Sequence, residues 1–250
     1  MKILVDTDCI MYPIGFYAAS NGIELDDTLE YLNKRMAELE ELCVETFGNP
    51  EIDFDVFVAA KGDVNFRDRF HKYVDYKANR KKRKLDPLWI TEMKAELLLN
   101  SSNPIVCDSE DGEVDDFIAI YSTHYKETET PCAILGVDKD FNQLPGTRLN
   151  PTSSKVIEIG EMDALQFLYE QIMAGDSADN VPGIPKIGHI KAGKALEGCA
   201  TEQEMFNTAL QGYIEVYGDN EEAAERMFEC ANLVYLRRHE TDFWSPPDGC

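Results

Sequence analysis

The chain has 250 residues, of which 24 are Lys or Arg and 47 are Asp or Glu, so its formal net charge is −23. A chain of this length removes roughly 70–75% of its unfolded surface from water on folding, so its core needs no disulfide or metal. Hydrophobic residues make up 44% of it, which excludes wholesale disorder. No apolar run reaches the ~18 residues of a membrane-spanning helix.

The seven cysteines are odd in number, widely spaced and without a C-x-x-C pair. This pattern favours reduced thiols over a disulfide framework. The first apolar run, Ile3–Val5, ends at Asp6, so we expect no secretory leader. The sequence therefore predicts a cytoplasmic protein with no membrane association.

Short apolar runs alternate with helix-length segments over the first 140 residues. Asp27–Phe47 has an apolar residue every three or four positions, with Asp26 as the expected N-cap and Gly48 as the terminator. The expected buried strands are Ile3–Val5, Val56–Ala60, Ile105–Cys107 and Ala133–Val137. This alternation predicts an α/β fold with a mostly parallel central sheet flanked by helices.

A basic segment interrupts this pattern. Arg67–Lys84 holds nine basic and two acidic residues, a local charge of +7. The rest of the chain is strongly acidic and repels a polyanion, so contact with nucleic acid must be concentrated in this segment or bridged by metal ions. A solvated charged helix is the alternative interpretation of such a run, although the interleaved aromatic residues suit stacking on bases.

The remainder of the chain is mainly helical. A half-exposed strand is expected at Lys155–Ile159, and a helix at Glu161–Ala174. Residues 175–188 are rich in Gly and Pro and must form a shaped loop. Three further helices are expected at about 189–198, 202–217 and 220–236.

Acidic residues follow or open several of these elements. They form four clusters: Asp6 and Asp8; Glu113, Asp115 and Asp116; Asp138 and Asp140; Asp176 and Asp179. Because the carboxyl ends of parallel strands share one edge of a sheet, clusters that are distant in sequence can converge there. Converging carboxylates repel one another unless cations lie between them, and Mg²⁺ or Mn²⁺ prefers such oxygen ligands. A pair of ions would suit phosphodiester hydrolysis.

Each cluster also has a structural interpretation. Asp is a common turn and N-cap residue, and some acidic residues follow strands by chance in so acidic a chain. On a regular helix Glu113 and Asp115 would point about 200° apart. Both can serve one site only if Glu113 precedes the helix.

Together these motifs resemble the metal-dependent 5′-nucleases, the 5′-to-3′ exonuclease and flap endonuclease family, and are most similar to its short stand-alone phage exonucleases. The resemblance covers nearly the whole chain. The motifs that carry it are residues 3–8, Phe66-Arg67, residues 76–80, residues 113–116, residues 138–141 with Leu144, and the loop 175–188.

The resemblance implies two divalent ions, Mg²⁺ or Mn²⁺, held by carboxylates. Asp6, Glu113, Asp115 and Asp116 would serve the first ion. Asp138 would lie between the two, and Asp140, Asp176 and Asp179 would serve the second. The family has an Asp where this chain has Ala60, and Asp63 is the candidate replacement.

The resemblance also implies contacts with the substrate. Lys77 and Arg80 match residues that contact the phosphate being cut, and Tyr76 matches an aromatic residue that stacks on the substrate. Lys81, Lys82 and Arg83 would attract the strand. In the family's helix-three-turn-helix, Gly183, Lys186, Gly188 and Lys191 would contact duplex DNA, with K⁺ assisting.

The implied protein is an Mg²⁺-dependent 5′-to-3′ exonuclease and flap endonuclease that leaves a 5′-phosphate and a 3′-hydroxyl. We expect a core at 1–160, with a basic helical arch at about 64–100, and a helical duplex-binding region at 161–250. The expected partner is DNA with a free 5′ end, a flap or a nick, with an RNA–DNA hybrid as a further candidate. The expected oligomeric state is a monomer.

Three alternatives stay open at this point. A haloacid-dehalogenase-like phosphatase would use Asp6 and Asp8 as nucleophile and acid, with Gly175-Asp176-Ser177 as its late metal motif; that motif should then follow a strand. A compact PIN-like ribonuclease would share the fold and the acidic site. A structure-specific DNA-binding module without catalysis is suggested by Ala60.

Overall fold

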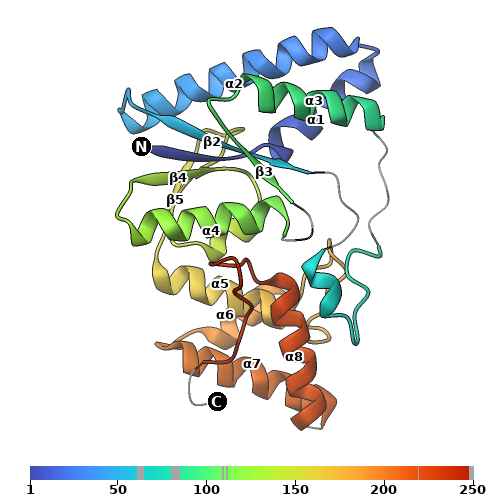
Figure 1. Cartoon of the computed structure of the whole chain (residues 1–250). Coiled ribbons are helices and arrows are strands. Elements are labelled where there is room, and N and C mark those ends of the chain that lie inside the picture. The colour runs from blue at the N-terminus through green and yellow to red at the C-terminus, as the bar shows by residue number, and fades with distance from the viewer. Residues whose placement is uncertain (61–64, 80–84, 109, 111, 219, 248–250) are drawn as a thin grey trace. The chain divides into compact units, whose positions relative to one another are not determined.

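The computed structural model describes residues 1–60, 65–79, 85–108, 110, 112–218 and 220–247 (Figure 1). The chain forms two compact units. Unit 1 comprises Met1–Val64, Lys82–Phe141 and Gly146–Glu158, and unit 2 comprises Asn65–Lys81, Asn142–Pro145 and Ile159–Cys250. No helix among the described residues is long and apolar enough to cross a membrane.

Unit 1 is built on a six-stranded sheet in the order β3-β2-β1-β4-β5-β6. The strands are β1 (Lys2–Asp6), β2 (Asp53–Ala59), β3 (Asn103–Cys107), β4 (Cys132–Leu135), β5 (Gly146–Leu149) and β6 (Val156–Ile159). The pairs β1·β2, β1·β4, β2·β3 and β4·β5 are parallel. The predicted α/β architecture is confirmed. The central strands β1, β2 and β4 are largely buried, as expected for strands that are covered on both faces.

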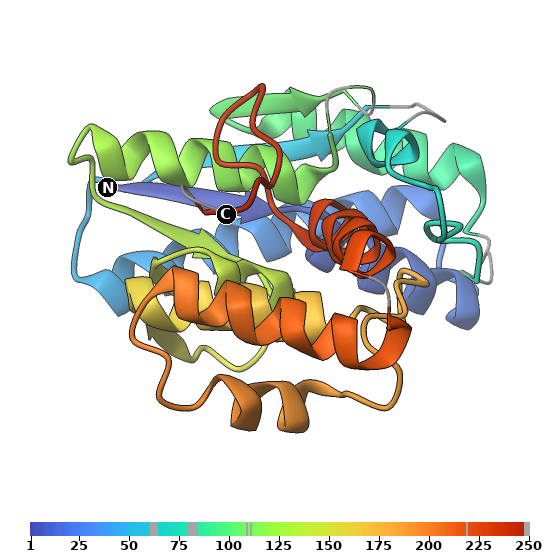
Figure 2. The same cartoon turned by 90° about the horizontal axis from the view of Figure 1, so that it is seen from below.

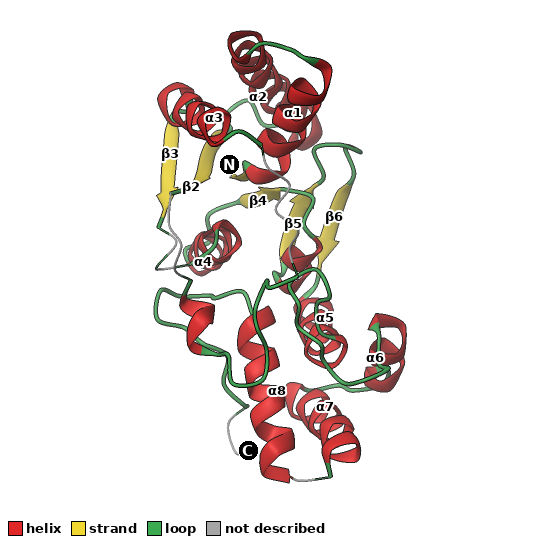
Figure 3. Ribbon diagram, turned by 90° about the vertical axis from the view of Figure 1, so that its right-hand side faces the viewer, coloured by secondary structure: helices red, strands yellow, loops and turns green. Residues whose placement is uncertain are grey.

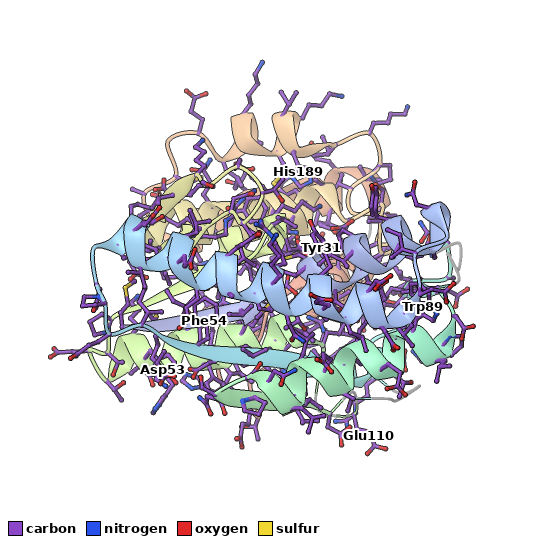
Figure 4. All side chains as sticks on the ribbon, turned by 90° about the horizontal axis from the view of Figure 1, so that it is seen from above. Tyr31, Asp53, Phe54, Trp89, Glu110 and His189 are labelled. Atoms are coloured by element: carbon purple, nitrogen blue, oxygen red, sulfur yellow. The ribbon has the colours of Figure 1, made fainter. Side chains whose placement is uncertain are left out.

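Four helices cover the sheet. Three of them, α1 (Asp8–Asn21), α2 (Leu25–Phe47) and α3 (Pro87–Asn100), lie on one face, and α4 (Val114–Glu127) lies on the other (Figure 3). On the three-helix face, Ile3 and Val5 share a core with Leu32 and Met93. Figure 4 looks onto this face and labels Tyr31, whose exposed fraction is 52%.

A buried carboxylate ties three elements together near the amino ends of the strands. Asp55 on β2 is fully buried. It accepts hydrogen bonds from Lys2 Nζ on β1 (3.1 Å), from the Tyr125 hydroxyl on α4 (2.5 Å) and from the Asn103 side chain on β3. These three donors compensate the cost of burying the Asp55 carboxylate.

Unit 2 is helical. It contains α5 (Glu161–Ala174), α6 (His189–Leu196), α7 (Glu202–Tyr217) and α8 (Asn220–Val234). Figure 2 shows α8 nearly end-on while α7 lies across the view, so the two helices cross steeply. Their core includes the buried side chains of Tyr169, Ile172, Tyr213 and Met227.

The segment expected to form a helical arch differs from the prediction. Among its described residues, 65–79 contain one short 3-10 helix, Phe66–Arg69, followed by turns, and α3 packs on unit 1. Lys77 has a φ of 58°, which an α-helix does not accommodate. Residues 65–81 group with unit 2 and not with the sheet, because Arg67 donates hydrogen bonds to the carbonyls of Leu233 and Tyr235.

Smaller differences concern single elements. The predicted helix at Asp27–Phe47 begins two residues earlier, at Leu25, with Glu24 at the N-cap; its end at Gly48 (φ 61°) is confirmed. Neither α1 nor β5 was predicted. In α1, Pro13 lies inside the helix, and Gly15 faces Leu85 so closely that a Cβ would lie 2.6 Å from Leu85 Cδ2.

Candidate metal centre and nucleic-acid interface

Three carboxylates of unit 1 stand at the carboxyl edge of the sheet. Asp6 is the last residue of β1, Asp138 follows β4, and Asp115 lies in the first turn of α4. Asp6 is only 4% exposed. Asp6 and Asp138 are more than 130 positions apart in sequence, and the parallel pairing of β1 with β4 brings them to the same edge.

The electrostatics of the three groups show that they interact. Burial, together with the charges of Asp8 and Asp138, raises the pKa of Asp6 to about 7. Burial likewise raises the pKa of Asp115 well above its usual range, followed by the charges of Asp6, Asp138, Glu113 and Asp116. Each carboxylate therefore opposes ionisation of its neighbours.

Two of the predicted clusters share one local geometry. The Asp8 N–H donates to Asp6 Oδ1 (3.0 Å), and the Asp140 N–H donates to Asp138 Oδ1 (2.9 Å). In each case the side chain of the first Asp accepts the N–H of the residue two positions later, which forms an Asx-turn. Asp6 and Asp138 are thus oriented by their own loops.

The third cluster opens α4. Glu113 occupies the N-cap with extended backbone (φ −88°, ψ 165°), so it precedes the helix, as a site shared with Asp115 requires. Asp116 is fully buried, and its Oδ2 accepts the Glu113 N–H (3.0 Å). That bond gives Asp116 a capping role; its role as a metal ligand stays a prediction.

The donor set of unit 1 suits a hard divalent cation. Its members are carboxylates, and a cation among them would relieve the repulsion that raises the pKa of Asp6 and Asp115. Across the described residues, no three His, Cys, Asp or Glu side chains are arranged so that they could hold an ion by themselves.

The end of β2 contains no carboxylate among its described residues. The Ala60 N–H donates to the Cys107 carbonyl (2.7 Å), and Asp63 lies outside the described residues. Lys94 of α3 reaches this place and donates to the Ala59 carbonyl (2.8 Å). Burial lowers the pKa of Lys94, while the charge of Asp8 raises it. Sequence reasoning missed this amine.

Arg148 is a second residue that sequence reasoning missed. It is 8% exposed and its Nη1 donates to the Asp138 carbonyl (2.6 Å). Burial lowers the pKa of Arg148 and the charge of Asp138 raises it. The guanidinium therefore supports the loop that carries Asp138. Arg148 lies on the four-residue strand β5, where no sequence motif marks it as part of a site.

In unit 2, Asp176 and Asp179 open the predicted Gly/Pro loop. Asp176 is 7% exposed; its Oδ1 accepts the Ala178 N–H (2.8 Å), and its backbone pairs with Val181. Asp179 Oδ2 accepts the Tyr76 hydroxyl (3.1 Å) and lies 3.7 Å from Lys77 Nζ. The structure thus joins a predicted metal ligand to the predicted phosphate-contacting lysine.

The loop closes on itself through two glycines. Gly175 (φ 71°) and Gly183 (φ 58°) lie so close that a Cβ on Gly183 would be 2.4 Å from the Gly175 nitrogen. Further along, Gly188 is the N-cap of α6, and Lys191 Nζ donates to the Lys186 carbonyl (2.9 Å). Residues 188–191 at the start of this helix are exposed, and a helix N-terminus favours an anion.

Tyr76 and Lys77 lie in the turn before the described segment ends. Lys77 Nζ lies 4.8 Å from the Tyr76 ring centre, and the Lys77 N–H donates to the Asp179 carbonyl (2.8 Å). The predicted substrate contacts Arg80, Lys81, Lys82 and Arg83 lie outside the described residues.

The late acidic motif also bears on the phosphatase alternative. Gly175-Asp176-Ser177 follows α5, whose C-cap is Gly175. A phosphatase of that class would carry this motif after a strand, so the structure disfavours the alternative.

The chain matches known proteins in sequence and in structure. It is 31% identical over 105 residues to flap endonuclease Xni of Shewanella oneidensis, a match spanning 38% of this chain and 40% of the relative. It is 26% identical over 227 residues to DNA polymerase I of Caldicellulosiruptor bescii, spanning 82% of this chain and 25% of the relative. No protein-family model matches the chain.

Among solved structures, the phage T5 5′-exonuclease with bound zinc superposes with a TM-score of 0.66 at 18% identity, covering 94% of this chain and 90% of that one. The resemblance to the 5′-nucleases and the predicted fold are thereby confirmed. The chain spans less than half the length of the two sequence relatives.

Proposed function

We propose that the protein is a 5′-to-3′ exonuclease and flap endonuclease that hydrolyses DNA phosphodiesters and leaves a 5′-phosphate and a 3′-hydroxyl. The observation that carries this proposal is the group of mutually repelling carboxylates, Asp6, Asp115 and Asp138, at the carboxyl edge of a parallel sheet. Sequence similarity to a flap endonuclease supports the same activity.

The carboxylates would hold two Mg²⁺ or Mn²⁺ ions. Asp6, Glu113, Asp115 and Asp116, with Asp63, would serve the first ion; Asp138 would serve both; Asp140, Asp176 and Asp179 would serve the second. When bound, such ions lower the pKa of water and stabilise the charge on the reacting phosphate. Water would complete their coordination shells, as Mg²⁺ usually requires.

Basic and aromatic residues would place the DNA strand. Lys77 and Arg80 would approach the charge that develops on the transferring phosphoryl group, and Tyr76 would stack on the substrate. Lys81, Lys82 and Arg83 would attract the strand through long-range electrostatics.

The loop and α6 would grip duplex DNA. Lys186, Gly188 and Lys191, which are exposed, would present backbone N–H groups and charge to phosphates, with K⁺ as an assisting cation. Gly183 is buried against the backbone of residues 174 and 175, so its predicted contact with DNA is replaced by a role in shaping the loop. The partner would be DNA with a free 5′ end, flap or nick, with an RNA–DNA hybrid as a second substrate, and the enzyme would act as a monomer in the cytoplasm.

A time course on 5′-labelled flap, nicked and blunt duplexes tests the proposal. With Mg²⁺ we expect short 5′-phosphorylated products, and with a chelator we expect none. Substrate that is bound but uncut in Mg²⁺ would instead favour the DNA-binding module. Comparing matched RNA and DNA strands separates this activity from a PIN-like ribonuclease.

A further inference from the structure

One buried carboxylate of unit 2 has no role in the proposed chemistry. Glu229 of α8 is 5% exposed. Its side chain accepts three hydrogen bonds from backbone N–H groups: Tyr73 N–H to Oε1 (2.9 Å) and to Oε2 (3.0 Å), and Val74 N–H to Oε1 (3.0 Å). Charge-assisted bonds of this kind are stronger than neutral ones.

These bonds fix the chain just ahead of Lys77. Tyr73 and Val74 stand four and three residues before that lysine, and their N–H groups are taken by Glu229 in place of the carbonyls of a helix. The backbone can therefore turn, and Lys77 reaches its left-handed conformation (φ 58°). A non-glycine residue keeps such a strained backbone conformation only when contacts with the surrounding structure hold it there.

A second set of bonds holds the other side of the same turn. The Lys77 N–H donates to the Asp179 carbonyl (2.8 Å), Asn79 Nδ2 donates to the Ser177 carbonyl (2.7 Å), and Asn180 Nδ2 donates to the Asp75 carbonyl (2.8 Å). The turn at 75–79 is thus fixed between α8 and the loop at 176–181.

We propose that Glu229 and Asn79 are positioning residues that hold Lys77 in place for the reaction, and the inference rests on the proposed nuclease function. Both act through the backbone: Glu229 accepts the Tyr73 and Val74 N–H groups, and Asn79 donates to the Ser177 carbonyl. A misplacement of about 1 Å in a catalytic group can cost about a hundredfold in rate.

The kinetic test compares Glu229→Gln with the wild type on a 5′-flap duplex in Mg²⁺. The amide keeps the size of the side chain but offers one acceptor oxygen and presents an NH₂ group to backbone donors. We expect kcat to fall by about ten- to a hundredfold while KM changes less than about threefold.

A double-mutant cycle with Lys77→Ala separates positioning from general stability. In the Lys77→Ala background, Glu229→Gln should cause little further loss, because the lysine through which it acts is gone. Glu221→Gln, an exposed residue on the same helix, is the charge-matched control and should leave kcat unchanged. Equal losses from Glu229→Gln with and without Lys77 would overturn the inference.

Two further measurements keep the test decisive. Asn79 is exposed, so Asn79→Ala tests the second set of bonds even if Glu229→Gln fails to fold; it should lower kcat about three- to tenfold, again only when Lys77 is present. Hydrogen exchange of the Tyr73 and Val74 amides should speed up in Glu229→Gln while α5 and α7 stay protected.

The outcomes distinguish the two proposals. A wild-type protein without nuclease activity would overturn the proposed function, and with it the catalytic role of the turn. An active wild type whose kcat survives both Glu229→Gln and Asn79→Ala would overturn only the positioning role.

Discussion

At the scale of single residues, Asp138 interacts with the two other carboxylates of the candidate metal centre. Its charge acts on both Asp6 and Asp115, and it is the proposed ligand of both ions. Asp138→Ala should lower cleavage by at least about a thousandfold, since several kcal/mol of transition-state stabilisation are lost. DNA binding, measured by anisotropy, should largely survive. Glu41→Ala, an exposed acidic residue on α2, is the control; wild-type turnover by Asp138→Ala would refute the assignment.

Lys77 allows a complementary prediction. Its ammonium group lies 3.7 Å from Asp179 Oδ2 in unit 2. Lys77→Ala should slow single-turnover cleavage about a hundred- to a thousandfold, as does loss of one group that stabilises a developing negative charge. The Mg²⁺-induced rise in melting temperature should match that of the wild type. Loss of that rise would mean that the lysine supports metal binding instead.

The raised pKa of Asp6 predicts how metal binding depends on pH. The folded, metal-free protein keeps this proton up to about pH 7, whereas the unfolded chain releases it near 4. Between these values the folded state binds more protons, so the free energy of unfolding of the metal-free protein falls as pH rises. Metal needs the ionised form, so its stabilising effect should grow over the same window.

Thermal denaturation with Mg²⁺ and with chelator checks this at pH 5.5, 7 and 8. The metal-induced shift should be smallest at pH 5.5 and largest at pH 8. In Asp6→Asn the shift should be small at every pH. A wild-type shift that does not change with pH would contradict the prediction.

At the scale of elements, the loop after α5 depends on the absence of a side chain at Gly183. A Cβ there would lie 2.4 Å from backbone atoms of Ala174 and Gly175, and φ is 58°. Gly183→Ala should lower the free energy of unfolding by more than about 3 kcal/mol, the combined cost of strain and overpacking. Gly198→Ala (φ 90°, no atom within 4 Å) carries strain alone and should cost about 1–2 kcal/mol. Urea denaturation compares the two; equal losses would argue against the close contact.

The elements differ in how far they could be predicted from sequence. The bounds of α5 and α7 could be predicted to the residue, because each has an apolar stripe and a clear terminator. Helix α1 could not, since Pro13 and the small buried residues Gly15 and Ala18 weaken that stripe. The turn that bears Lys77 could not either, because its shape depends on Glu229, about 150 positions away.

The residues of the candidate site also differ in whether a local sequence pattern marks them. Asp6, Asp115 and Asp138 could be predicted because each stands where a strand ends or a helix begins, a position that the chain itself marks. Arg148 and Lys94 could not, because their importance lies in tertiary neighbours: the carbonyls of Asp138 and Ala59. No local pattern distinguishes such basic residues from ordinary surface charges.

At the scale of the whole molecule, the uneven charge should govern the proposed binding of DNA. The chain carries −23 overall, so attraction to DNA must come from a few concentrated cations and from bound metal. Affinity for a 5′-flap in Ca²⁺, measured by anisotropy, should fall about a hundredfold between about 50 and 200 mM salt, as expected for roughly four phosphate contacts. A flat salt dependence would argue against a phosphate-dominated interface.

Asp55 sets the alignment of the strands from the end of the sheet opposite the carboxylates. If β2 shifted by one position, the Asp55 carboxylate would lose its hydrogen bonds to Lys2, Asn103 and Tyr125. Its charge would then be buried without partners. A wrong strand register therefore costs free energy even in the absence of metal ions and DNA. The position of Asp6 at the end of β1 therefore depends on a register that Asp55 helps to set beside Leu4, two residues earlier.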